Sequence, residues 1–134
     1  MIVVDTSVLV DLLRGRDNAA VRRFEELEAE GADLWIPGIC CQELLQGARD
    51  LREWRKLEQY LSVQQLLFPA DPWKAHRNAA RIYFDCRRKG ITLRGSVDCL
   101  IACLVIEAGA MLLHNDGDFE KMRAACPLKT VELG

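Results

Sequence analysis

The sequence has no long hydrophobic run. None of its apolar stretches approaches the roughly 20 residues that a membrane-spanning helix needs. A basic segment at the N-terminus, which a signal peptide requires, is also missing, and Asp5 interrupts the first short apolar stretch. We therefore expect a soluble protein with no membrane partner, located in the cytoplasm.

Closely spaced cysteine pairs of the C-x2-C type are absent as well. A structural zinc site is typically built from such pairs, and a disulfide framework is not expected in a reducing compartment in a chain of 134 residues that can hold a core unaided. We predict small buried core residues at all six cysteine positions, which are Cys40, Cys41, Cys86, Cys99, Cys103 and Cys126.

Motifs for a protein nucleophile are missing too. Neither histidine lies in a G-x-S-x-G or Cys-His context, and no glycine-rich phosphate loop is present. The net charge of −2 argues weakly against a nucleic-acid partner. Basic residues nevertheless cluster locally, and bound divalent cations would offset the acids. The total charge therefore does not decide whether the protein binds nucleic acid. The two clusters are Arg14, Arg16, Arg22 and Arg23, and Arg87, Arg88, Lys89 and Arg94.

Short apolar segments rich in β-branched residues alternate along the chain with segments of helical periodicity, which indicates an α/β fold with a mainly parallel sheet between helical layers. No linker or repeat interrupts residues 1–134, so we expect a single domain. The expected strands are Met1–Val4, Leu34–Ile36, Leu66–Phe68, Met111–His114 and Thr130–Leu133. The expected helices are Asp17–Glu30, Ile39–Ala48, Leu51–Leu61, Pro72 to Gly90, Val97–Ala108 and Asp118–Ala125.

Five acidic residues stand at positions that favour a shared site. Asp5 ends the first strand and Asp116 follows the fourth, and ligands of parallel sheets bind at the carboxyl ends of strands. Asp98 begins a helix whose next eight residues are apolar, so its charge needs a positive partner. Glu43 lies at the edge of an apolar helix face, and Asp118 is a helix cap or a further ligand. For each acid alone, a turn, a cap, a helix-dipole contact or a solvated surface position is an equally ordinary explanation.

Converging carboxylates would repel one another and protonate unless a cation lay between them. Oxygen ligands favour a hard ion, Mg²⁺ or Mn²⁺, over zinc. Such ions activate water and stabilise the entering and leaving oxygens when a phosphodiester is hydrolysed. The acids therefore predict metal-dependent phosphodiester chemistry that needs no protein nucleophile.

Three stretches of the chain resemble a known family. They are VVDTSVLV at residues 3–10, IP with QELLQG at residues 36–47, and SVDCLIA with LHNDGDF at residues 96–119. Their order and spacing are similar to those of PIN-domain ribonucleases, in particular VapC-type toxins of toxin–antitoxin pairs.

The resemblance implies roles for individual residues. The four catalytic acids and metal ligands would be Asp5, Glu43, Asp98 and Asp116, with Asp118 as a further metal ligand. The hydroxyl of Thr6 or Ser7 would orient Asp5 or a water molecule. His114 replaces a frequent threonine, whose supporting contact would be lost or taken over by Asn115.

The resemblance also implies a three-layer α/β/α sandwich, a homodimer, an RNA substrate and an inhibitory antitoxin partner. The arginine clusters could hold phosphates. The helix at Leu51–Leu61, which carries Trp54, is either packed into the core or offered as apolar surface to a partner.

Two alternatives differ in function. A haloacid-type phosphatase needs a second acid two residues after the first, where this chain has Ser7. A catalytically inactive PIN-like scaffold that binds RNA or protein would typically have lost site acids, whereas the full set is present here. Metal binding discriminates between a scaffold and an enzyme.

Overall fold

The computed structural model describes residues 1–133 and contains one parallel sheet of four strands. The strands are β1 (Ile2–Val4), β2 (Leu34–Pro37), β3 (Leu66–Leu67) and β4 (Met111–Leu113), in the spatial order β3-β2-β1-β4. Every pair is parallel, with Val3 beside Trp35 on one side and beside Leu112 on the other. This confirms the predicted α/β class with a parallel sheet.

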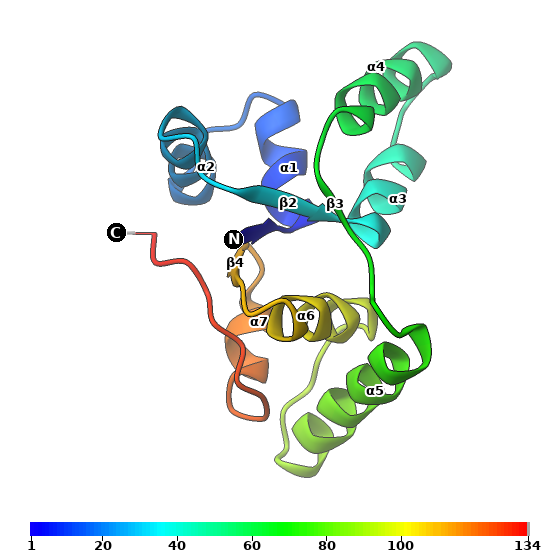
Figure 1. Cartoon of the computed structure of the whole chain (residues 1–134), viewed down its shortest axis with the longest axis vertical. Helices are drawn as coiled ribbons and strands as arrows, with labels where there is room; N and C mark the ends of the chain where they lie inside the picture. The colour runs from blue at the N-terminus through cyan, green and yellow to red at the C-terminus, as the bar shows by residue number, and fades with distance from the viewer. Residues whose placement is uncertain (134) are drawn as a thin grey trace.

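Helices lie on both faces of this sheet (Figure 1). One group consists of α1 (Thr6–Leu13), α2 (Ala19–Ala29), α3 (Gly38–Gln46) and α4 (Leu51–Ser62). The other consists of α5 (Pro72–Arg88), α6 (Val97–Glu107) and α7 (Gly117–Met122), and α5 packs along α6. The result is the three-layer α/β/α arrangement. None of the helices among residues 1–133 is both long enough and apolar enough to cross a membrane.

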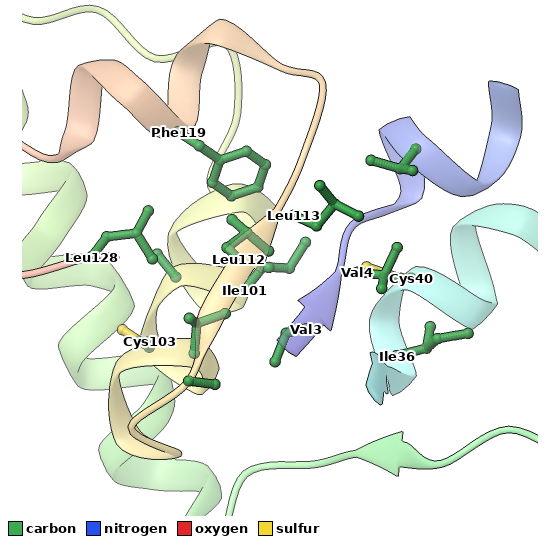
Figure 2. Packing of buried hydrophobic residues seen from close by; sticks show 14 of the residues in the cluster. Val3, Val4, Ile36, Cys40, Ile101, Cys103, Leu112, Leu113, Phe119 and Leu128 are labelled. Atoms are coloured by element: carbon green, nitrogen blue, oxygen red, sulfur yellow. The ribbon is translucent and has the colours of Figure 1, made fainter. Parts of the chain in front are cut away.

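The core lies between β1, β4 and α6 (Figure 2). Val3, Val4, Leu112 and Leu113 have no exposed surface, as expected for strands of a parallel sheet that is covered on both faces. Phe119 of α7 is also fully buried. The thiols of Cys40, Cys86, Cys99 and Cys103 are buried and free, which confirms the prediction for these four, whereas Cys41 and Cys126 are half-buried.

One helix was missed in the sequence, and two predicted segments differ most from the structure. Helix α1 follows β1 directly, with Asp5 as its N-cap, so the polar Asp-Thr-Ser turn begins a helix rather than a loop. Helix α7 begins at Gly117 and ends at Met122, because Asp116 and not Asp118 is its N-cap. The predicted strand Thr130–Leu133 is reduced to one parallel bridge between Leu112 and Thr130.

The strand order places a crevice at the carboxyl ends of the two central strands. Strand β1 leads into α1, in the first group of helices, while its neighbour β4 leads into α7, in the second group. The chain thus leaves adjacent strands in opposite directions, which opens the ligand-binding crevice of parallel α/β folds. Asp5 and Asp116 follow these two strands, so the topology brings both to that crevice.

Candidate metal centre

Asp5 is a buried carboxylate with a hydroxyl partner. The backbone N–H of Ser7 donates to its Oδ2 at 3.0 Å, and the Ser7 hydroxyl donates to the same oxygen at 2.6 Å. The Cys40 thiol makes a long contact with its Oδ1, at 3.8 Å. Burial raises the pKa of Asp5 despite these hydrogen bonds. One oxygen of Asp5 is therefore used for capping α1, and the other can bind a ligand.

Asp116 repeats this arrangement at the start of α7. Its Oδ1 accepts the backbone N–H of Asp118 at 3.0 Å and also contacts the guanidinium of Arg94. Within residues 1–133, its Oδ2 accepts no hydrogen bond. Each of these two acids is thus a helix N-cap and a potential ligand, because capping occupies one carboxylate oxygen.

Asp98, in the first turn of α6, lies against two other acids. Ligand oxygens of Asp98, Asp116 and Asp118 all lie within 4.8 Å of one another. Burial, followed by the charges of Asp5, Asp116, Asp118 and Glu43, raises the pKa of Asp98 to about 7. Its carboxylate accepts no hydrogen bond from the described residues. No hydrogen-bond donor among residues 1–133 therefore stabilises the charge of Asp98 in the crevice.

Glu43 of α3 lies outside this group of three acids. The Thr6 hydroxyl donates to its Oε1 at 2.8 Å, which fixes the glutamate to α1. Burial is the main reason why the pKa of Glu43 is raised, with a smaller contribution from the charge of Asp5. Glu43 thus lies near Asp5, at the border of the acid cluster rather than at its centre.

The supporting contacts are divided among more residues than the sequence suggested. Thr6 holds Glu43, and Ser7 holds Asp5, so both hydroxyls have an acid partner. The backbone N–H of Asn115 donates to the Ser7 hydroxyl at 2.9 Å, whereas the Asn115 side chain donates to Asp11. Asn115 therefore contributes through its backbone and not through its side chain.

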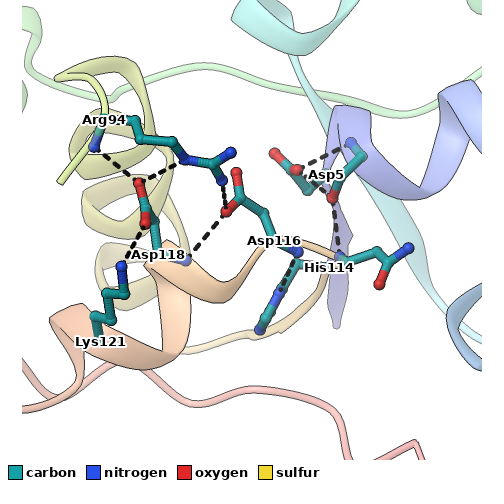
Figure 3. Close-up of polar contacts among 8 residues, drawn as sticks. Asp5, Arg94, His114, Asp116, Asp118 and Lys121 are labelled. Carbon is teal, nitrogen blue, oxygen red and sulfur yellow. Dashed lines mark hydrogen bonds and ion pairs between the residues drawn. The ribbon is translucent and has the colours of Figure 1, made fainter.

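His114 and Arg94 contact the site in ways that sequence reasoning missed. His114 Nδ1 accepts the backbone N–H of Asp116 at 3.1 Å, and Nε2 lies 3.2 Å from Glu120. Arg94 reaches both Asp116 and Asp118 from the loop between α5 and α6 (Figure 3). No periodic pattern places Arg94 beside the acids; the sequence shows it only as a member of a basic cluster, four residues before Asp98.

Asp118 is held by Arg94 and Lys121. It is almost fully buried, and its Oδ2 accepts both the backbone N–H of Arg94 at 2.9 Å and the Arg94 Nε at 3.3 Å. The ammonium of Lys121 lies 3.5 Å from its Oδ1. The backbone hydrogen bond from Arg94 is the largest reason why the pKa of Asp118 is lowered. Both of its oxygens have partners, so Asp118 is more suited to holding the Arg94 loop than to free coordination.

The remaining oxygens fit a divalent cation. Oδ1 of Asp5, both oxygens of Asp98 and Oδ2 of Asp116 lack strong donors within residues 1–133. An all-oxygen set is typical of Mg²⁺ or Mn²⁺ sites. Burial, and after it the charges of the neighbouring acids, raises the pKa of Asp98 to about 7, and a bound cation would stabilise the ionised carboxylate against both effects.

A groove of about 580 Å³ borders Glu43 between α1, α3 and α4. Its lining combines apolar side chains, such as Leu57 and Tyr60 of α4, with four basic ones. The basic side chains are Arg14, Arg16, Arg49 and Lys56. Leu61, at the end of α4, is buried, whereas Leu51 at its start is exposed, so this helix contributes both to the core and to an open surface.

Comparison with known proteins shows the family of this chain. Residues 2–125 match the family model of the PIN domain. This chain belongs to the PIN domain family. The PIN domain is 37% identical to a VapC ribonuclease of Mycobacterium bovis over 121 residues, and these residues make up 90% of each chain. It is 33% identical over 122 residues to ribonuclease VapC51 of Mycobacterium tuberculosis, covering 91% of this chain and 85% of that protein.

Solved structures show the same fold at lower sequence identity. The PIN domain superposes on a chain of DNA-bound VapBC from Salmonella typhimurium with a TM-score of 0.75 at 20% identity, covering 99% and 98% of the two chains. It superposes on a chain of VapBC-1 from nontypeable Haemophilus influenzae with a TM-score of 0.74 at 20% identity, again over 99% and 98%. These likenesses support the three-layer arrangement of this chain.

Proposed function

We propose that this PIN domain is an endoribonuclease toxin that hydrolyses RNA phosphodiester bonds with a divalent metal ion, Mg²⁺ or Mn²⁺. The observation that carries the proposal is the cluster of Asp98, Asp116 and Asp118, in a chain 37% identical to a VapC ribonuclease. Asp5 borders this cluster, close enough for its charge to raise the pKa of Asp98. Asp5, Asp98 and Asp116 would hold the ion, with Glu43 at the border of the site and Asp118 in support.

The ion, when bound, supplies activation of water and stabilisation of charge on the phosphate. The chain's own residues do the positioning. Ser7 keeps Oδ2 of Asp5 occupied and directs Oδ1 toward the crevice. Thr6 holds Glu43 in place beside Asp5, where its carboxylate could accept a proton from water. His114 fixes the backbone of Asp116 and thereby the direction of its carboxylate.

We also propose a cytoplasmic homodimer that is inhibited by a cognate antitoxin protein. The solved relatives are toxin–antitoxin complexes, which supports an antitoxin partner. The groove beside Glu43 offers apolar side chains together with Arg14 and Lys56, which have no ion-pair partner among residues 1–133, and this suits an amphipathic segment that carries acidic residues. Occupation of this groove would also cover the approach to Glu43.

Cleavage of a labelled total-RNA pool by purified, antitoxin-free protein tests the function. The reaction is run with Mn²⁺, with Mg²⁺ and with chelator, beside Asp98→Asn and the surface control Asp17→Asn. We expect metal-dependent cleavage that Asp98→Asn abolishes and Asp17→Asn retains. Absence of cleavage with every metal, together with no thermal stabilisation by Mn²⁺, would instead indicate a non-catalytic scaffold.

A further inference from the structure

Arg94 bridges two acids of the cluster with a single guanidinium. Its Nε lies 3.3 Å from Oδ2 of Asp118, and its terminal nitrogen contacts Oδ1 of Asp116 (Figure 3). Since Asp116 is also one of the acids within reach of Asp98, this positive group lies at the edge of the place where a metal ion would bind. Arg94 therefore offsets part of the negative charge of the crevice.

The backbone of Arg94 is held separately from its side chain. The neighbouring Leu93 is buried, and the backbone N–H of Arg94 donates to Oδ2 of Asp118 at 2.9 Å. The Arg94 side chain, in contrast, is 74% exposed. The guanidinium can therefore leave the two acids while the loop keeps its position.

Neither acid would lose all its partners if the guanidinium left. Asp118 would keep the backbone N–H of Arg94 and the ammonium of Lys121, and Asp116 would keep the backbone N–H of Asp118. The Arg94 side chain is exposed although its acid partners are not, so water can solvate the guanidinium when it leaves them. A divalent cation at Oδ2 of Asp116 would carry twice the charge of the guanidinium and would repel it from the neighbouring Oδ1.

We propose that Arg94 is a positioning residue with two partners. In the metal-free protein, its guanidinium balances Asp116 and Asp118; once a divalent cation is bound, it turns to a phosphate group of the RNA beside the acids. The planar guanidinium suits both partners, because its parallel N–H groups match the oxygens of a carboxylate or a phosphate. The inference rests on the proposed function, since it takes the acids as metal ligands and RNA as the substrate.

The first test is Mn²⁺ binding by isothermal titration calorimetry, which needs no catalysis. Arg94→Gln removes the competing charge, so Mn²⁺ affinity should rise about two- to fivefold, the range expected for an exposed ion pair. Arg81→Gln is the matched control, because Arg81 is 73% exposed and pairs with Asp85 on α5. Its Mn²⁺ affinity should equal that of the parent protein.

The second test is binding of a fluorescein-labelled mixed-sequence RNA, measured by anisotropy with Ca²⁺ and with chelator. A gel run afterwards verifies that the RNA is intact. Ca²⁺ should increase the RNA affinity of the parent protein, because cation binding frees Arg94 for phosphate. In Arg94→Gln this gain should shrink about fivefold or more, as expected for the loss of a charge-assisted hydrogen bond.

Unchanged or weaker Mn²⁺ binding by Arg94→Gln would show that Arg94 only supports the loop, and an undiminished Ca²⁺ gain in RNA affinity would rule out the phosphate contact. If the parent protein itself binds no Mn²⁺, the proposed metal site is wrong as well. Should Arg94→Gln fail to fold, Arg94→Lys keeps the charge without the paired N–H groups. This variant should bind Mn²⁺ within about twofold of the parent, yet show a smaller Ca²⁺ gain in RNA affinity.

Discussion

Replacing Asp98 with asparagine should stabilise the metal-free protein at alkaline pH. Burial and the neighbouring acids raise the pKa of Asp98 from its ordinary value of 3.8 to about 7. The folded state therefore holds a proton that the unfolded chain releases. As a result, the free energy of unfolding falls as the pH rises from about 4 to about 7, and it stays lowered above pH 7. Asparagine carries no charge and avoids this loss.

The size of the effect follows from the same values. A fully buried carboxylate with this difference in pKa would cost about 4 kcal/mol, at about 1.4 kcal/mol per pH unit. Asp98 is only half-buried, and screening by solvent reduces the cost to about 1–2 kcal/mol. For a domain of this size, that corresponds to a rise in Tm of about 3–8 °C at pH 8.

Thermal unfolding followed by circular dichroism, in chelator and at pH 5 and pH 8, measures this difference. Asp98→Asn should melt above the parent at pH 8, and the gap should shrink to less than half at pH 5. The control Asp17→Asn makes the same chemical change at an exposed residue that pairs with Arg22. Mn²⁺ should reverse the order, because it stabilises only a protein that binds it. A lower Tm of Asp98→Asn at pH 8 in chelator would refute the reasoning.

Three further variants probe the supporting contacts. Ser7→Ala removes the hydroxyl between Asp5 and Asn115 and should lower Mn²⁺ affinity about 10- to 100-fold in calorimetry, as outer contacts of metal ligands do. Thr6→Val removes the hydrogen bond to Glu43 and should lower the cleavage rate about tenfold, as measured by the fluorescence of a labelled RNA. Its Mn²⁺ affinity should change little. Phe119→Ala, at a fully buried ring under the crevice, should cost about 3–5 kcal/mol of stability in urea unfolding. Unaltered values for these variants would contradict the roles assigned to their contacts.

Sequence patterns revealed the acids because each of them has a distinctive place along the chain. Asp98 precedes eight apolar residues, and this pattern correctly predicted a buried helix that begins with a charge. Asp5 and Asp116 follow apolar strands, and the parallel order of the sheet brings such positions to one edge. Local pattern and topology therefore agree at these three positions.

The roles of Thr6 and Ser7 could not be separated without α1. Consecutive residues of a helix point about 100° apart, so Thr6 meets Glu43 of α3 while Ser7 meets Asp5 and the Asn115 backbone. The sequence suggested a turn here, because the short polar stretch hid the helix start. The sequence therefore did not indicate which hydroxyl contacts Asp5 and which contacts Glu43.

Arg94 and the last strand illustrate a different difficulty. The contact of Arg94 with Asp116 and Asp118 joins residues that lie 22 and 24 positions apart, and no local pattern encodes it. Thr130–Leu133 has the β-branched residues of a strand, yet only Lys129 and Val131 form backbone hydrogen bonds with Leu112. In both cases tertiary contacts, rather than local preference, decide the outcome.

A crystal structure of the protein grown with Mn²⁺, analysed by anomalous diffraction, tests the central claim most directly. We predict an anomalous peak in contact with carboxylate oxygens of Asp5, Asp98 and Asp116, with the Arg94 guanidinium moved away from Asp116. The peak should be absent in crystals of Asp98→Asn grown in the same solution. A parent crystal without Mn²⁺ at these acids, or with Mn²⁺ bound only elsewhere, would contradict the account.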